Sequence, residues 1–201
     1  MKIKSFVETS YKGMYKLTSE EGSSFYMRKE YSDALLINFD LLEAGYELNE
    51  QQTENCLDNG LCCAAEFKAL QYLARAEQSY TGLYKKLLDK GHKSEYAAFA
   101  LSYLQRIGYL SDRRFARAWL NTRRTNHYEG KSRLLAELTK RGISKATALD
   151  ALDEFFQEND EEEILAKAYE KLSKNKSGDK LIAALMQAGF TYKQIKEFVT
   201  F

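Results

Sequence analysis

The sequence predicts a mainly α-helical protein made of three tandem three-helix repeats. These helix-turn-helix-like repeats are expected to stack into an elongated, curved solenoid, behind a small N-terminal β-hairpin or sheet. Three observations lead to this fold class. A leucine and glycine signature recurs three times, at separations of 51 and 47 residues. Proline is absent from all 201 residues, so nothing forbids long helices. Segments typical of strands are confined to the first 30 residues.

The composition is that of a globular protein. Hydrophobic residues make up 44% of the chain and charged residues 29%, and no apolar run is long enough to cross a bilayer. Residues 1–8 contain neither the apolar centre of a secretory signal nor the arginines of a transit peptide. We therefore expect a cytoplasmic protein without membrane contact.

The first 30 residues predict a small antiparallel sheet or hairpin. Short segments rich in aromatic and β-branched side chains lie at 2–8, 13–18 and 24–30. The polar residues 19–23 predict a turn between the last two segments.

The next segment predicts a helix. Apolar side chains recur there at helical spacing, at Ala34, Leu35, Ile37, Leu41 and Leu42. Ser32 and Asp33 can cap its first turn. We expect a helix from Ser32 onward, and a first segment, 1–60, that combines the strands with linking helices.

The repeated signature consists of two leucines four residues apart, followed after four more residues by a glycine. Its copies are Leu83-x3-Leu87-x3-Gly91, Leu134-x3-Leu138-x3-Gly142 and Leu181-x3-Leu185-x3-Gly189. In each copy we expect the leucines to face inward from one short helix, and the glycine to supply the left-handed residue that ends it. Each copy therefore predicts a helix that stops at a tight corner.

A helix is expected on either side of each corner. Amphipathic stretches precede the three copies at 66–75, 112–124 and 162–172. A polar cap follows each corner and opens another amphipathic run, at Ser94, Ser144 and Thr191. Three such helices bury little alone, so neighbouring repeats should share their faces. The predicted repeats span 61–111, 112–158 and 159–201.

Charge is unevenly distributed, although its net value is only +1. Residues 1–60 carry 6 basic and 11 acidic side chains, residues 61–150 carry 17 and 8, and residues 151–201 carry 7 and 10. Between residues 113 and 145, ten basic side chains stand against Glu129 and Glu137 alone. We name these ten the basic stripe: Arg113, Arg114, Arg117, Arg123, Arg124, Lys131, Arg133, Lys140, Arg141 and Lys145.

The basic stripe indicates an anionic partner. Arginine predominates in it, and the planar guanidinium can bind phosphate or carboxylate through two parallel hydrogen bonds. The helical period places Arg113, Arg117 and Arg124 on one side of their helix, away from the apolar positions of Phe115–Trp119. We expect Asp112 to help cap that helix. The alternative is a solvated helix face that binds nothing.

The sequence offers no catalytic, cofactor or metal site. Neither common glycine-rich phosphate loop is present, and neither His92 nor His127 has the partners found in zinc proteases or serine hydrolases. The acidic run 160–163 opens a helix, where carboxylates favour the helix dipole. Cys56, Cys62 and Cys63 fit neither a disulfide framework nor a zinc site, and we expect them to be reduced and partly buried. We therefore expect a protein that is not an enzyme and needs no cofactor.

Two sequence blocks resemble a known family. They are Gly108-Tyr109-Leu110-Ser111-Asp112-x2-Phe115-Ala116 and Gly130-x2-Arg133-Leu134-x2-Glu137-Leu138-x2-Arg141-Gly142-Ile143. Together with the stretch 64–75 and the first leucine copy, they resemble the RecX family of regulators of the RecA recombinase. The resemblance covers roughly residues 60–200.

The resemblance implies a non-enzymatic regulator of recombination, DNA repair and the SOS response. Members of the family bind in the helical groove of the RecA filament on single-stranded DNA, and they restrain strand exchange, ATP hydrolysis and the co-protease activity of RecA. The implied partners are the RecA filament and, through it, single-stranded DNA, and the protein is expected to be a monomer. From the charge pattern we expect the interface to consist of Arg113, Arg114, Arg117, Arg123, Arg124, Lys131, Arg133, Lys140 and Arg141.

Two other functions remain open from the residues alone. A helix-turn-helix transcription regulator would need one recognition helix that reads base edges, usually in a dimer. The basic stripe instead spans two helices and a loop, which suits contact with a nucleic-acid backbone better. A pure protein scaffold would show no salt-dependent binding to DNA.

Overall fold

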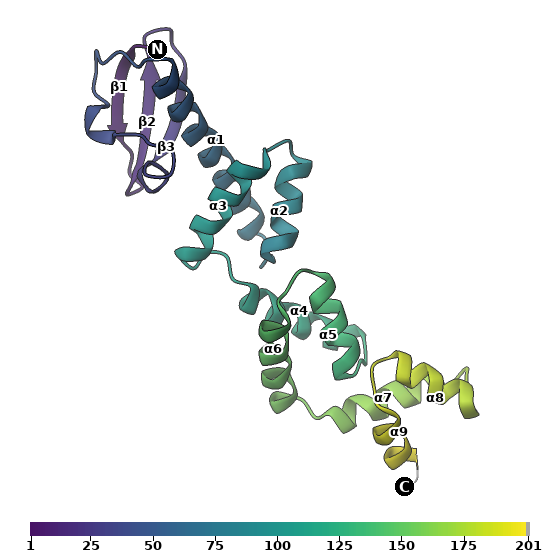
Figure 1. Ribbon diagram of the computed structural model, residues 1–201. Coiled ribbons are helices and arrows are strands. Elements are labelled where there is room, and N and C mark those ends of the chain that lie inside the picture. The colour runs from purple at the N-terminus through teal and green to yellow at the C-terminus, as the bar shows by residue number, and fades with distance from the viewer. Residues whose placement is uncertain (200–201) are drawn as a thin grey trace. The chain divides into compact units, whose positions relative to one another are not determined.

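The computed structural model describes residues 1–199, with the side chain of Asn126 left out of the description. It contains three strands, β1 (Ile3–Glu8), β2 (Met14–Ser19) and β3 (Ser24–Arg28), followed by helices (Figure 1). The helices that the described residues form are α1 (Glu50–Leu73), α2 (Tyr80–Asp89), α3 (Ser94–Arg106), α4 (Asp112–Asn126), α5 (Lys131–Lys140), α6 (Lys145–Glu158), α7 (Glu161–Ser173), α8 (Gly178–Gln187) and α9 (Tyr192–Val199). The predicted class, mainly helical with a small N-terminal sheet, is confirmed.

The three strands form an antiparallel sheet in the order β1-β2-β3. Leu17 at the centre of β2 lies opposite Phe6 on one side and Phe25 on the other. One face of the sheet buries Ile3, Leu17 and Met27 completely, against a core that includes Leu42, Leu48 and Cys56. The sheet is stable because this face is covered by the segment after it and by α1.

The helix predicted from Ser32 is wrong. Residues 32–36 make turns, and only the short 3-10 helix Phe39–Leu41 follows before α1. Leu36 has a φ of 52°, the amide of Ile37 donates to the Ser32 carbonyl at 2.9 Å, and the amide of Leu36 donates to the Asp33 carbonyl. This bonding pattern ends a helix after a single turn. Of the apolar side chains that suggested a helix, Leu42 is buried in the core beneath the sheet and Ile37 packs against it, whereas Leu41 is exposed.

α1 begins at Glu50, earlier than the expected stretch 66–75. Asn49 accepts a hydrogen bond from the amide of Gln52, whose side chain accepts one from the Asn49 amide, so both ends of a capping box are present. The helix therefore begins before residue 60 and continues through it. The boundary at residue 60 between the N-terminal segment and the first repeat stays a prediction.

The chain forms two compact units. The first contains residues 1–76 and 83–110, and the second contains residues 77–82 together with those from 111 onward. In the second unit, α4–α6 and α7–α9 contribute to one apolar core, with Leu120, Leu138 and Leu152 from the former and Leu165 and Leu185 from the latter. Two helix triplets thus share one core, as expected of tandem repeats.

The three glycines of the repeated signature end their helices as predicted. Gly91, Gly142 and Gly189 have φ values of 84°, 84° and 104°. Two of these corners, both in the second unit, are closely packed. A Cβ on Gly142 would lie 2.2 Å from Thr81 Oγ1, and one on Gly189 would lie 2.5 Å from the Cβ of Arg133. Glycine is therefore required there by its conformation and by the space available.

A serine hydroxyl stabilises each of these two corners. Ser79 donates to the Arg141 carbonyl at 3.0 Å, and Ser132 donates to the Gly189 carbonyl at 2.8 Å. The first serine lies just before α2 and the second in the first turn of α5. The second unit therefore contains the same joint twice, a helix start packed against a glycine corner.

Candidate functional site

The helix α4 carries half of the basic stripe. Ser111 caps it by accepting from the Arg114 amide at 3.3 Å. The expected capping role of Asp112 is not what the structure has, because its carboxylate accepts from the Tyr80 amide at 2.8 Å, at the start of α2. Ala116 and Leu120 are buried on the inner side of α4. The hydrophobic pattern therefore turns the arginines outward, as predicted.

Arg113 and Arg117 form an outer row on α4, opposite two carboxylates on α6. Arg113 pairs with Glu154, and Nη2 of Arg117 lies 3.2 Å from Oε1 of Glu158. Both pairs join positions four residues apart on each helix, so they form a regular ladder. The two arginine side chains remain 67% and 61% exposed. The hydrogen bond to Glu154 raises the pKa of Arg113.

Two further stripe residues contact α6 or the residue at its end. Nζ of Lys131 lies 2.5 Å from Oδ1 of Asp153. Arg124 donates to the side-chain oxygen of Asn159, the residue that ends α6. A groove of about 380 Å³ follows the ladder, lined by Arg113, Arg114, Arg117, Glu154, Gln157 and Glu158. Four residues of the stripe therefore contact α6 or the residue that ends it: Arg113, Arg117, Arg124 and Lys131.

A second set of stripe residues is held more deeply. Arg123 donates to both oxygens of Glu129, at 2.6 and 2.9 Å, and its side chain is only 25% exposed. Arg141 donates to Glu137 at 2.6 Å and lies over the Trp119 ring, 4.6 Å from its centroid. These hydrogen bonds raise the pKa of Arg123 and lower that of Glu137. Arg123 therefore connects α4 to Glu129 in the loop before α5, and Arg141 connects the end of α5 to Trp119 on α4.

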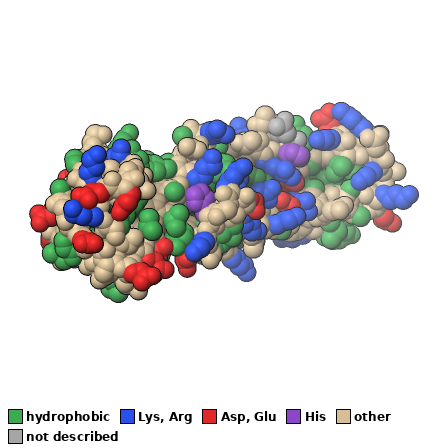
Figure 2. Space-filling view, turned by 90° about the horizontal axis from the view of Figure 1, so that it is seen from above, with side chains coloured by type: hydrophobic (Ala, Val, Ile, Leu, Met, Phe, Trp, Pro, Cys, Tyr) green, Lys and Arg blue, Asp and Glu red, His purple; other side chains and the backbone are tan. Residues whose placement is uncertain are grey.

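The remaining stripe residues lie at the edges. Nε of Arg114 lies 2.7 Å from Oε1 of Glu77, and Nη2 of Arg133 lies 3.1 Å from Oε1 of Glu137. Lys140 and Lys145 are exposed and form no ion pair with any residue that the structure describes. On the face drawn in Figure 2, blue basic side chains are likewise interrupted by red acidic ones.

The acidic partners on α6 were missed by the sequence analysis. Asp150, Asp153, Glu154 and Glu158 follow one another at helical spacing, and this pattern was available as a signal. Their contact with α4 joins residues 41 positions apart in two of the pairs. Spacing along one helix could reveal the acidic row, but the fold alone reveals what it faces.

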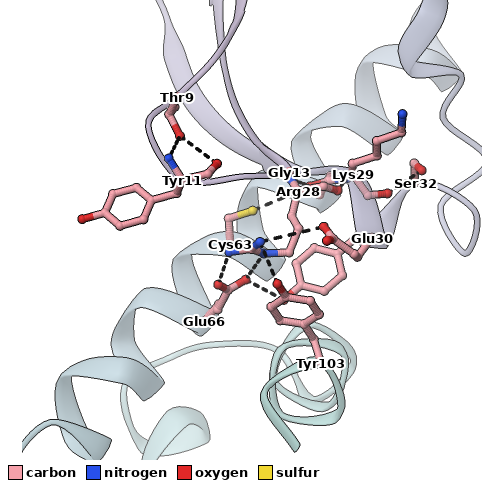
Figure 3. A network of polar contacts seen from close by, with 12 residues as sticks. Thr9, Tyr11, Gly13, Arg28, Lys29, Glu30, Ser32, Cys63, Glu66 and Tyr103 are labelled. Carbon is pink, nitrogen blue, oxygen red and sulfur yellow. Dashed lines mark hydrogen bonds and ion pairs between the residues drawn. The ribbon is translucent and has the colours of Figure 1, made fainter. Parts of the chain in front are cut away.

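A buried polar network in the first unit was also missed (Figure 3). Arg28 at the end of β3 donates to both oxygens of Glu66 on α1, at 2.7 and 2.5 Å, and to the Tyr103 hydroxyl on α3 at 2.8 Å. Tyr31 donates to the same carboxylate, and Asn59 bonds both to the amide and to the carbonyl of Arg28. Burial disfavours the charge of Arg28, but the bonds to Glu66 outweigh it and raise its pKa. The network therefore connects β3 to α1 and α3 through buried hydrogen bonds.

The described residues hold no group of three His, Cys, Asp or Glu side chains that could bind a metal ion. Cys56, Cys62 and Cys63 are free and buried, and burial raises the pKa of Cys56 to about 11 and that of Cys62 to about 12. No helix within residues 1–199 has the length and apolarity needed to span a bilayer.

Comparisons with known proteins identify the family. A family model for the second three-helix domain of RecX matches residues 111–152, which carry the whole basic stripe. Regulatory protein RecX of Treponema pallidum is 39% identical over 126 residues, which are 63% of this chain and 77% of that protein. Regulatory protein RecX of Clostridioides difficile is 28% identical over 161 residues, covering 77% of this chain and 76% of that one.

Solved structures agree on the fold. A crystal structure of regulatory protein RecX superposes with a TM-score of 0.76 at 22% identity, covering 100% of this chain and 99% of that chain. The crystal structure of RecX from Lactobacillus salivarius gives a TM-score of 0.60 at 21% identity, over 70% of this chain and 95% of that chain. Helix triplets that share a core define a helical-repeat protein. The chain belongs to the RecX family, and its role is regulatory.

Proposed function

We propose that this protein binds the RecA filament on single-stranded DNA and restrains its strand exchange, ATP hydrolysis and co-protease activity. The observation that carries the proposal is the outer row of α4. Arg113 and Arg117 are more than half exposed, and their partner carboxylates are 34% exposed at Glu154 and 59% exposed at Glu158. The row lies within the part of the chain that matches the second RecX domain.

The energetics of these pairs support the proposal. An exposed ion pair contributes at most about 1 kcal/mol to stability, because solvent screens it and two side chains lose freedom. A guanidinium can therefore exchange such a carboxylate for a phosphate at little cost, and it binds phosphate through the same two-pronged geometry. Arg123 and Arg141 are bound more firmly, so the proposal assigns them to maintaining the shape of the surface.

The proposed action requires no chemistry from the chain. It also requires no reading of base sequence, because contacts to phosphates position a protein without specifying a sequence. A helix-turn-helix transcription regulator would instead distinguish one duplex sequence from another. Equal binding to single-stranded oligonucleotides of different sequence therefore separates the two functions.

The test measures inhibition of RecA ATP hydrolysis on single-stranded DNA. The test variant combines Arg117→Ala, Arg124→Ala, Lys131→Ala and Arg133→Ala. The control combines Lys4→Ala, Lys12→Ala, Lys16→Ala and Lys90→Ala, which removes the same charge elsewhere. We expect the test variant to inhibit more weakly than the control and with a flatter dependence on salt, by about one unit of slope for each phosphate that is no longer bound. Equal potency of the two variants across a range of salt would refute the proposed interface.

A further inference from the structure

A strongly acidic segment of the sequence lies in the first unit. Residues 30–67 contain nine Asp or Glu and no Lys or Arg. Seven of these carboxylates are exposed. Glu30 lies 3.8 Å from Arg28, and the other six form no ion pair with another residue in the described part of the chain. They are Asp33, Asp40, Glu43, Glu47, Glu50 and Glu54. Their charge is therefore available to a partner of opposite sign.

A leucine with a strained backbone, Leu36, lies between Asp33 and Asp40 in this segment. Leu36 has a φ of 52° and is 85% exposed. The left-handed conformation is costly for any residue with a Cβ, and at the end of a helical turn it is normally occupied by glycine or asparagine. The fold thus holds a large apolar side chain in water at a position that also strains its backbone. Such a combination indicates a function outside the stability of the unit.

The surface beside Leu36 is hollow and apolar. Leu36, Ile37 and Asn38 line a pocket of about 80 Å³ whose other walls include Leu41 and Leu48. The same three residues line an open depression of about 540 Å³. Asp33, Asp40 and one cation, Lys29, also line the depression. Leu41 is itself 45% exposed. The apolar floor of the depression is therefore bordered by the two carboxylates of Asp33 and Asp40 and by one cation, Lys29.

We propose that this surface, defined by Leu36, Ile37 and Leu41 with Asp33, Asp40 and Glu43, docks a protein segment in which a large apolar side chain is flanked by Lys or Arg. The apolar side chain packs between Leu36 and Leu41, and the cationic ones face the carboxylates. Charge complementarity selects this occupant, because nucleic acid and anionic lipid would be repelled. The proposal is independent of the basic stripe and of RecA binding.

The test selects peptides from a phage-displayed random 12-residue library on the full-length protein. We expect the selected peptides to combine large aliphatic or aromatic residues with Lys or Arg. A synthetic peptide of the selected consensus is then titrated against variants. Leu36→Ser should weaken its binding by about tenfold or more, because the leucine surface that the peptide would bury is removed. Asp40→Asn with Glu43→Gln should also weaken it and reduce its dependence on salt.

Two further variants make the outcome unambiguous. Leu36→Gly removes the side chain while favouring the left-handed backbone, so it should abolish peptide binding without reducing thermal stability. Leu88→Ser changes a leucine that is 38% exposed on α2 and should leave binding unchanged. Selected peptides that are acidic, or that bind the Leu36 variants as well as wild type, would overturn the proposal. So would the absence of any enriched peptide, or a dimer of the protein that Leu36→Gly dissociates.

Discussion

Removing the two carboxylates of the outer ladder should strengthen binding to DNA and to the filament. Glu154→Gln with Glu158→Gln keeps the shape of both side chains and one acceptor oxygen on each, but removes their charge. In the wild type each carboxylate pairs with an arginine of α4 and must give it up when a phosphate binds. In the variant Arg113 and Arg117 no longer have an anionic competitor.

The size of the effect follows from the exposure of the pairs. An exposed ion pair changes an equilibrium constant by about 1.5- to 5-fold. Two such pairs give an expected gain in affinity of about 2- to 30-fold at low salt. The gain should diminish as salt rises, since both the pairs and the phosphate contacts are screened.

The assay is fluorescence anisotropy of a labelled oligothymidine, free and coated with RecA, from about 50 to about 300 mM salt, a range over which the screening length falls markedly. The control is Glu170→Gln with Glu197→Gln, two exposed carboxylates that pair with lysines elsewhere in the second unit. Both variants raise the formal net charge from +1 to +3. Equal gains for the two would mean that only total charge matters, and weaker binding by the ladder variant would show that the carboxylates support the site. Either result would refute the role given to the ladder.

Three further predictions concern stability and reactivity. Gly142→Val should destabilise by more than about 1–2 kcal/mol in urea unfolding, because it adds a clash to the strain of a left-handed valine, whereas Gly91→Val should show the strain alone. Glu66→Gln should cost about 3–5 kcal/mol, because the buried Arg28 would keep only the more distant, partly exposed Glu30 as a counter-ion; a cost below about 1 kcal/mol would mean that the pair with Glu66 is dispensable. Cys62 should not react with a thiol reagent at about pH 8 until the protein is unfolded, because burial raises its pKa to about 12, and rapid reaction of the native protein would contradict this.

The elements that could be predicted from the sequence are those specified by short-range pattern. The three glycine corners depend on a signature within nine residues, whereas the expected cap of α4, Asp112, proved to be its neighbour Ser111. The helix expected from Ser32 failed because the same apolar spacing also suits a turn segment that packs under a sheet, which requires the sheet to be known.

The candidate site shows the same division between local and distant information. The residues of the basic stripe could be found by counting charges, and the helical period correctly turned Arg113 and Arg117 outward. Their pairing with α6 depends on how two helices pack, and the bond from Arg28 to Tyr103 joins residues 75 positions apart. No spacing within one helix encodes such contacts.

At two of the glycine corners, the first turn of a helix from the preceding repeat packs against the corner. Thr81 and Ser132 occupy the same place in successive repeats, two residues before the first leucine of the signature, and both lie at a following corner. The corresponding residue of the last repeat is Asp179, which is exposed. A carboxylate has no proton to donate to a corner carbonyl and would be repelled by its oxygen. The third repeat therefore cannot form, from this position, the hydrogen bond that Ser132 donates to the Gly189 carbonyl.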